Sequence, residues 1–126
     1  EVFTMTPQYQ FSTSDPERGD SAAKLKNPGN ANDHWNAILG YRVHRELLDS
    51  LKVPDRGLKR ARWAVLRLAS CPAILIEAGY LSNDSEARRV AIPAYRQRIA
   101  TAIADGVRGY ASVLDGTRRA AQARKS

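Results

Sequence analysis

An apolar run that ends in one carboxylate is the feature that most constrains this chain. Residues Ala73 to Ile76 are apolar without alternation, and two of the four are β-branched, which is typical of a strand buried on both faces. Glu77 ends the run and is followed by the small residues Ala78 and Gly79. Open α/β sheets bind ligands at the carboxyl ends of their strands. The pattern makes Glu77 a candidate catalytic residue, with a structural salt bridge to an arginine as the alternative.

The order of the expected elements favours the α/β class. Residues 2–5 are strand-like, and apolar residues recur at helical spacing from 35 to 51. Asn83, with Glu86 three residues later, resembles a capping box at the start of a short helix. Pro93 suits the first turn of a last helix, because a proline there gives up no hydrogen bond. Strands and helices therefore alternate along the chain.

Two polar segments flank this expected core. Residues 6–32 are rich in Ser, Pro, Gly, Asn and charged residues, which indicates a long loop. After Asp115, the last acid, the chain carries four cations: Arg118, Arg119, Arg124 and Lys125. We therefore expect one domain over residues 1–115, followed by a basic, disordered tail over residues 116–126. Residues 63–68 are ambiguous between helix and strand.

The charge of the chain suits an anionic partner. Twenty Lys and Arg against thirteen Asp and Glu give a formal net charge of +7, which fits nucleic acid, an anionic membrane surface or an acidic wall polymer. The basic stretch Lys59, Arg60 and Arg62 lacks the interleaved aromatics of single-strand binders, which argues against nucleic acid. A solvated face, or arginines lining an anionic substrate groove, explains it as well. No apolar run is long enough to indicate a membrane span.

The residues give little support for a metal site. His34 and His44 are not in a paired ligand spacing such as His-Glu-x-x-His, so we expect capping, surface or polar-face roles for them. We therefore assign no metal ligand in this chain. Cys71 is the sole cysteine, which excludes an internal disulfide, and its place before the apolar run favours a small core residue over a nucleophile.

Two linked segments resemble the zinc-dependent N-acetylmuramoyl-L-alanine amidases. The first is Asp-Arg-Gly-Leu-Lys at residues 55–59, with Val-Leu-Arg at 65–67. The second is Pro-Ala-Ile-Leu-Ile-Glu-Ala-Gly-Tyr-Leu-Ser-Asn at 72–83. The resemblance runs in register from about Trp35 to Tyr110 and continues weakly over the first six residues. The order and spacing of these motifs make it specific.

The resemblance implies hydrolysis of the amide between N-acetylmuramic acid and L-Ala of peptidoglycan. In that family a zinc ion held by two His and one Glu activates a water, and the strand-end carboxylate, here Glu77, serves as general base. It also implies a twisted, mostly parallel sheet with flanking helices, and a place in the cell envelope, periplasmic or extracellular. Arg56 and Arg67 become candidates for binding anionic stem peptides, with pairing to nearby acids as the alternative.

The zinc-ligand segments of that family have no counterpart in this sequence. They are a His-Gly-Gly strand end, a following Glu and a Ser-x-His-x-Asn segment. We therefore expect an incomplete fold, the carboxyl-terminal half of an amidase domain, with Glu77 present, the zinc ligands upstream and no hydrolase activity alone. The alternative, from another functional class, is a non-catalytic basic module that binds cell-wall polymer or nucleic acid.

Overall fold

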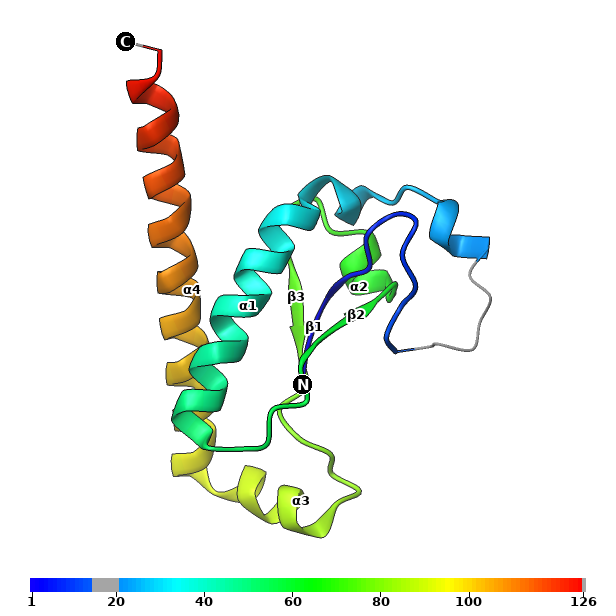
Figure 1. Cartoon of the computed structure of the whole chain (residues 1–126). Coiled ribbons are helices and arrows are strands. Elements are labelled where there is room, and N and C mark those ends of the chain that lie inside the picture. The colour runs from blue at the N-terminus through cyan, green and yellow to red at the C-terminus, as the bar shows by residue number, and fades with distance from the viewer. Residues whose placement is uncertain (15–20, 126) are drawn as a thin grey trace.

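A computed structural model describes residues 1–14 and 21–125 as a small α/β fold, which confirms the expected class. A three-stranded sheet carries the two longest helices on one face (Figure 1). The strands are β1 (Val2–Met5), β2 (Leu58–Ala61) and β3 (Ile74–Ile76). The helices are α1 (Asp33–Leu51), α2 (Ala64–Arg67), α3 (Asp84–Ala91) and α4 (Pro93–Ala123), with 3-10 turns η1 (Ser21–Lys24) and η2 (Pro28–Asn32).

β1 is the central strand of the sheet, in the order β2-β1-β3. It runs parallel to β2, with Val2 beside Leu58 and Met5 beside Ala61, and antiparallel to β3, with Val2 beside Ile76. The sheet is therefore mixed, where a mostly parallel one was expected. The chain passes from β2 to β3 through α2, which lies at the end of the sheet where β2 ends, so β3 runs back in the opposite direction. A strand parallel to β2 would need a crossover to the other end of the sheet.

The alternating side chains of β1 build a core on each face of the sheet. Val2 faces α1 and α4 and packs in a cluster with Leu39, Val43, Leu47, Ile99 and Ala102. Phe3 and Met5 face the other way and pack in a cluster with Ala61 and Leu66. All four residues of β1 are buried. Packed side chains therefore cover both faces of this strand.

β3 differs from the strand that its sequence predicted. Its residues Ile74, Leu75 and Ile76 are only half-buried, because β3 forms an edge of the sheet and has a neighbouring strand on one side. Cys71, expected in the core, is exposed in the bend before this edge strand. An apolar run without alternation therefore marked an edge strand here, while the doubly buried strand is β1.

α4 packs along α1 and continues past the N-terminal start of that helix (Figure 1). Residues 116–123, expected to be part of a disordered tail, belong to α4. Their alanines and arginines are strong helix formers, which favours continuation of the helix. Among the described residues, no helix is both long enough and apolar enough to cross a bilayer.

Arg62 organises the segment that follows β1. Its guanidinium donates to the carbonyls of Pro7 and Gln10 and to the hydroxyl of Ser12. This cation is therefore structural, which removes it from any solvated face or nucleic-acid patch. The expected loop over residues 6–32 contains η1 and η2, and its residues 15–20 lie outside the described residues. The ambiguous stretch after Arg62 forms the short helix α2.

The close approach of α1 and α4 predicts a specific intolerance to substitution at Gly106. A Cβ atom at this position would lie 2.5 Å from Cα of Val43, a residue with no exposed surface. Gly106→Ala must push the helices apart, and we expect a loss of about 2–3 kcal/mol of unfolding free energy, measured by denaturant titration.

Gly116→Ala in the same helix is the control. A Cβ there meets nothing within 4 Å, so this change should be neutral or stabilising by up to about 1 kcal/mol. Equal effects of the two changes would contradict the packing.

Candidate functional site

The sheet register brings three separate parts of the chain to one end of the sheet. Glu1 precedes β1, Gly57 precedes β2, and Glu77 follows β3. The N–H of Glu77 donates to the carbonyl of Glu1, and the backbone nitrogen of Glu1 donates to the carbonyl of Glu77, both at 2.8 Å. This pair of bonds continues the antiparallel ladder by one residue. The backbone of Glu77 is therefore fixed, while its carboxylate forms no hydrogen bond or ion pair with residues 1–14 or 21–125.

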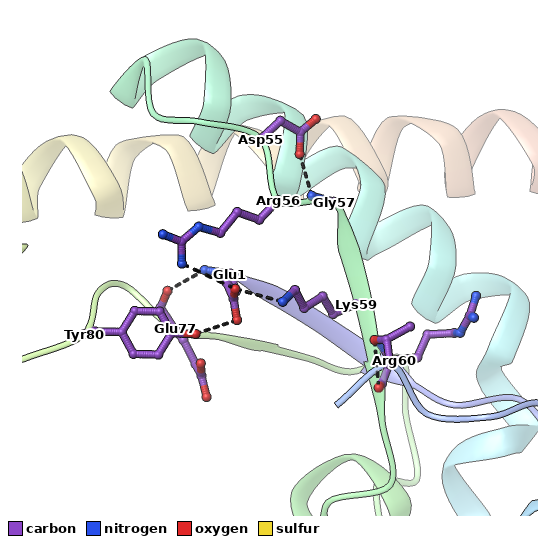
Figure 2. A network of polar contacts seen from close by, with 9 residues as sticks. Glu1, Asp55, Arg56, Gly57, Lys59, Arg60, Glu77 and Tyr80 are labelled. Atoms are coloured by element: carbon purple, nitrogen blue, oxygen red, sulfur yellow. Dashed lines mark hydrogen bonds and ion pairs between the residues drawn. The ribbon is translucent and has the colours of Figure 1, made fainter. Parts of the chain in front are cut away.

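The carboxylate of Glu1 lies at the centre of a polar network beside Glu77 (Figure 2). Nζ of Lys59 is 2.9 Å from it, the hydroxyl of Tyr80 donates to it at 2.8 Å, and the guanidinium of Arg56 is 3.8 Å away. The Glu1 side chain is 8% exposed. Burial by itself would raise the pKa of Glu1, but the hydrogen bonds from Lys59 and Tyr80 outweigh it and lower the pKa below its ordinary value. The network therefore holds Glu1 ionised.

Sequence reasoning missed Glu1, because an acid before a short strand carries no local sign of a partner. Lys59 and Tyr80 are 58 and 79 positions away from it, and only the register of the sheet brings them together. In turn, the hydrogen bond to Glu1 raises the pKa of the Tyr80 phenol. The hydroxyl therefore stays protonated and keeps donating to Glu1.

A tight turn presents Arg56 at the same end of the sheet. Oδ1 of Asp55 accepts from the N–H of Gly57 at 2.7 Å and lies 2.8 Å from Nε2 of His44. The Gly57 bond, followed by the His44 bond, lowers the pKa of Asp55 below its ordinary value. Gly57 has a φ of 76°, a left-handed conformation that glycine adopts without strain. Arg56 lies 5.9 Å from the centre of the Tyr80 ring and pairs with Glu1, as the structural alternative for this arginine predicted.

Arg67 is at the opposite end of the sheet. It lies in α2, which follows the end of β2 that pairs with Met5, and its carbonyl is close to Gly29 of η2. Four strand residues separate the two ends, a distance of roughly 10 Å or more. The structure thus brings Arg56 and Glu77 together and leaves Arg67 apart from them.

The turn after Glu77 is held by hydrogen bonds from α3. Oε2 of Glu86 accepts from the N–H of Tyr80 at 2.7 Å. The side chain of Asn83 accepts from the N–H groups of Ser85 and Glu86, which confirms the predicted cap. Glu86 bonds to Tyr80 rather than back to Asn83, so the expected capping box is only half formed. These bonds fix the chain on both sides of the exposed Tyr80 and Leu81.

Glu77 is half-buried and borders two hollows. The first, which we term the helix-side cavity, measures about 140 Å³ and lies between the end of β3 and the helices, with Leu47, Leu51, Arg56, Arg89, Val90 and Ile99 among its lining residues. The second, the strand-side hollow, measures about 290 Å³ and is lined by Glu1, Phe3, Thr13, Ser14, Lys59, Trp63, Glu77 and Tyr80. A group bound in either hollow would be adjacent to Glu77.

The described residues do not form a metal site. No three His, Cys, Asp or Glu side chains within residues 1–14 and 21–125 are arranged so that they could hold a metal ion. His34 is exposed and contacts Trp35 edge-on, while His44 is paired with Asp55. The donor set of this part of the chain therefore does not fit a zinc ion.

Comparison with known proteins gives a consistent family assignment. A family profile described as N-acetylmuramoyl-L-alanine amidase matches residues 14–109. The N-acetylmuramoyl-L-alanine amidase AmiA of Escherichia coli (strain K12) is 36% identical over 72 residues, which cover 57% of this chain and 25% of AmiA. The probable cell wall amidase LytH of Staphylococcus aureus is 29% identical over 106 residues, which cover 75% of this chain and 36% of LytH. The chain spans about a quarter to a third of these relatives. No solved structure matches it significantly.

The Glu1 network predicts a pH-dependent contribution to stability. Because the pKa of Glu1 is lowered on folding, the network stabilises the fold above the unfolded pKa of about 4.3, and this contribution is lost as the pH falls through the lower folded value. Glu1→Gln should therefore lower the melting temperature at neutral pH and have little effect near pH 2. Thermal melts of both chains at the two pH values measure this. An equal loss at both pH values would contradict the ionised network.

Proposed function

The chain belongs to the N-acetylmuramoyl-L-alanine amidase family, and we propose that it supplies the proton-transferring carboxylate, Glu77, of a zinc-dependent amidase. The reaction is hydrolysis of the amide between N-acetylmuramic acid and L-Ala in peptidoglycan, which places the protein in the cell envelope. The observation that carries this proposal is the position of Glu77. It is fixed through its backbone at a strand end, and its side chain borders two hollows.

Glu77 has the properties that this role requires. A general base must reach the water that it deprotonates and later return the proton to the leaving amine. A half-buried side chain at the rim of two hollows can meet both groups, and the backbone bonds to Glu1 fix the position from which it projects. The Glu1 carboxylate beside it is already bonded to Lys59 and Tyr80. Of the two, Glu77 is the one available for chemistry.

The zinc ion of the family supplies a polarised carbonyl and an activated water when bound. Because the described residues do not fit a zinc site, we propose that its ligands belong to parts of the amidase outside this chain. The coverage of the relatives supports this, since the matched regions are 25% of AmiA and 36% of LytH. The chain by itself is then an incomplete amidase domain without hydrolase activity.

Arg56 is the proposed substrate-binding cation at this end of the sheet. It is more than half exposed, and its contact with Glu1 is long, so it can also meet an anionic stem peptide. Arg67 is not part of this proposal, because it lies at the other end of the sheet.

Glu77→Gln tests the proposed role in a longer polypeptide that contains this chain and the zinc-ligand segments. Loss of the proton acceptor should lower kcat by about 10²–10⁴-fold with little change in melting temperature, because glutamine is nearly isosteric. The assay is release of stem peptides from purified peptidoglycan. Glu46→Gln, at an exposed carboxylate on α1, is the matched control and should retain full activity.

The 126-residue chain provides the second half of this test. We expect it to bind no zinc in elemental analysis and to release no peptide. One tightly bound equivalent of zinc, or hydrolysis by this chain, would overturn the assignment of the ligands to other segments. A different outcome would favour a non-catalytic binding module. In that case the longer polypeptide would cosediment with peptidoglycan, but neither its native sequence nor its Glu77→Gln variant would release stem peptides.

A further inference from the structure

His44 is a largely buried histidine of α1 that the proposed mechanism does not use. Its side chain is 12% exposed, and its Nε2 lies 2.8 Å from Oδ1 of Asp55. The bond from the N–H of Gly57 and the bond with His44 lower the pKa of Asp55, so this carboxylate is ionised at neutral pH. An ionised carboxylate only accepts hydrogen bonds, so Nε2 of His44 carries a proton and is the donor.

This hydrogen bond ties down the far end of residues 52–57, the connection from α1 to β2. At the near end, Lys52 has the left-handed conformation of a helix C-cap, and its N–H donates to a carbonyl of the last turn of α1. At the far end, Oδ1 of Asp55 accepts from the N–H of Gly57 at 2.7 Å, which closes a tight turn. The same oxygen accepts from His44, so the turn is joined to the helix.

Arg56 lies at the centre of this turn, and its own side-chain contacts are weak. The guanidinium extends toward the end of the sheet, 3.8 Å from the carboxylate of Glu1 and 5.9 Å from the centre of the Tyr80 ring (Figure 2). Both contacts are long, and the arginine side chain is 56% exposed, so solvent screens them. The direction of Arg56 therefore depends on the backbone from which it projects.

We infer that His44 is a positioning residue for Arg56. By donating to Asp55, it fixes the turn closed by Gly57 and directs the arginine toward the end of the sheet where Glu77 lies. This inference rests on the proposed function, in which Arg56 is the substrate-binding cation. It adds that a residue of α1 sets the position of this cation.

Two substitutions separate positioning from space filling, because His44 also lines the helix-side cavity. His44→Leu fills a similar volume but removes the donor to Asp55. His44→Gln keeps an N–H donor at the end of the side chain. Glutamine rescues a positioning residue and leucine does not, whereas a residue that only fills the cavity wall tolerates leucine at least as well.

Nuclear magnetic resonance of the 126-residue chain measures the position of Arg56 without zinc or activity. The Tyr80 ring, whose centre is 5.9 Å from the guanidinium, should shift the signals of the Arg56 side-chain protons, and Tyr80→Leu identifies this shift by its absence. We expect the shift to be lost in His44→Leu and kept in His44→Gln. The amide proton of Gly57 should exchange about three- to tenfold faster in His44→Leu, because one hydrogen bond that holds the turn is lost. Loss of the ring shift in both His44 variants, or in neither, would overturn the inference.

The longer polypeptide that contains the zinc-ligand segments gives the functional readout. His44→Leu should raise KM for a soluble muramoyl peptide about three- to tenfold and leave kcat unchanged, because it displaces a binding group and not Glu77. In the Arg56→Ala background the same change should add nothing, since His44 acts through that arginine. His34→Leu, at the exposed histidine of the same helix, is the matched control and should change neither constant.

Additive losses from the His44 and Arg56 changes, or a fall in kcat with KM unchanged, would overturn the positioning role. The proposed function fails separately, if the longer polypeptide releases no stem peptide or if Glu77→Gln leaves kcat unchanged. In that case the resonance measurements on the 126-residue chain still decide whether His44 sets the position of Arg56.

Discussion

The pairing of β1 with both of its neighbours is the constraint on which the structure depends. β1 is buried on both faces and is hydrogen-bonded on both edges, so its four residues fix the sheet register and the two packing cores together. The two long helices, α1 and α4, then pack on one face of this sheet. α1 lies on the face that Val2 presents, and α4 packs against α1 closely enough to require glycine at position 106. A small fold with a mixed sheet follows from this one strand.

The same pairing determines the chemistry at one end of the sheet. Because the antiparallel hydrogen-bond ladder of β1 and β3 continues to Glu1 and Glu77, these two acidic residues lie side by side in different environments. Lys59, Tyr80 and Arg56 surround Glu1, keep it ionised and use the hydrogen-bonding oxygens of its carboxylate. Glu77 borders two hollows, and its carboxylate has no bonded partner in the part of the chain that the structure describes. Environment, rather than residue type, separates a structural carboxylate from the candidate catalytic one.

Local patterns predicted where the main helices begin better than how far they extend or how the strands are buried. The cap at Asn83, the start of α4 at Pro93 and the helical pattern over residues 35–51 depend on neighbouring residues and are read directly from the sequence. The burial of β3 depends on which strands lie beside it, so its apolar run indicated a central strand where the structure has an edge. Likewise, nothing near Arg62 in the sequence shows that it holds residues 7–12.

The sequence by itself determined the family, the α/β class and the candidate role of Glu77, because motifs and local propensities are properties of adjacent residues. Only the tertiary structure decided which groups share the site. It brought Arg56 to the end of the sheet where Glu77 lies, placed Arg67 at the other end, and introduced Glu1, which no motif had marked. The physical reason is that contacts between residues far apart in the chain are set by strand register and helix docking. Neither is encoded at any single position.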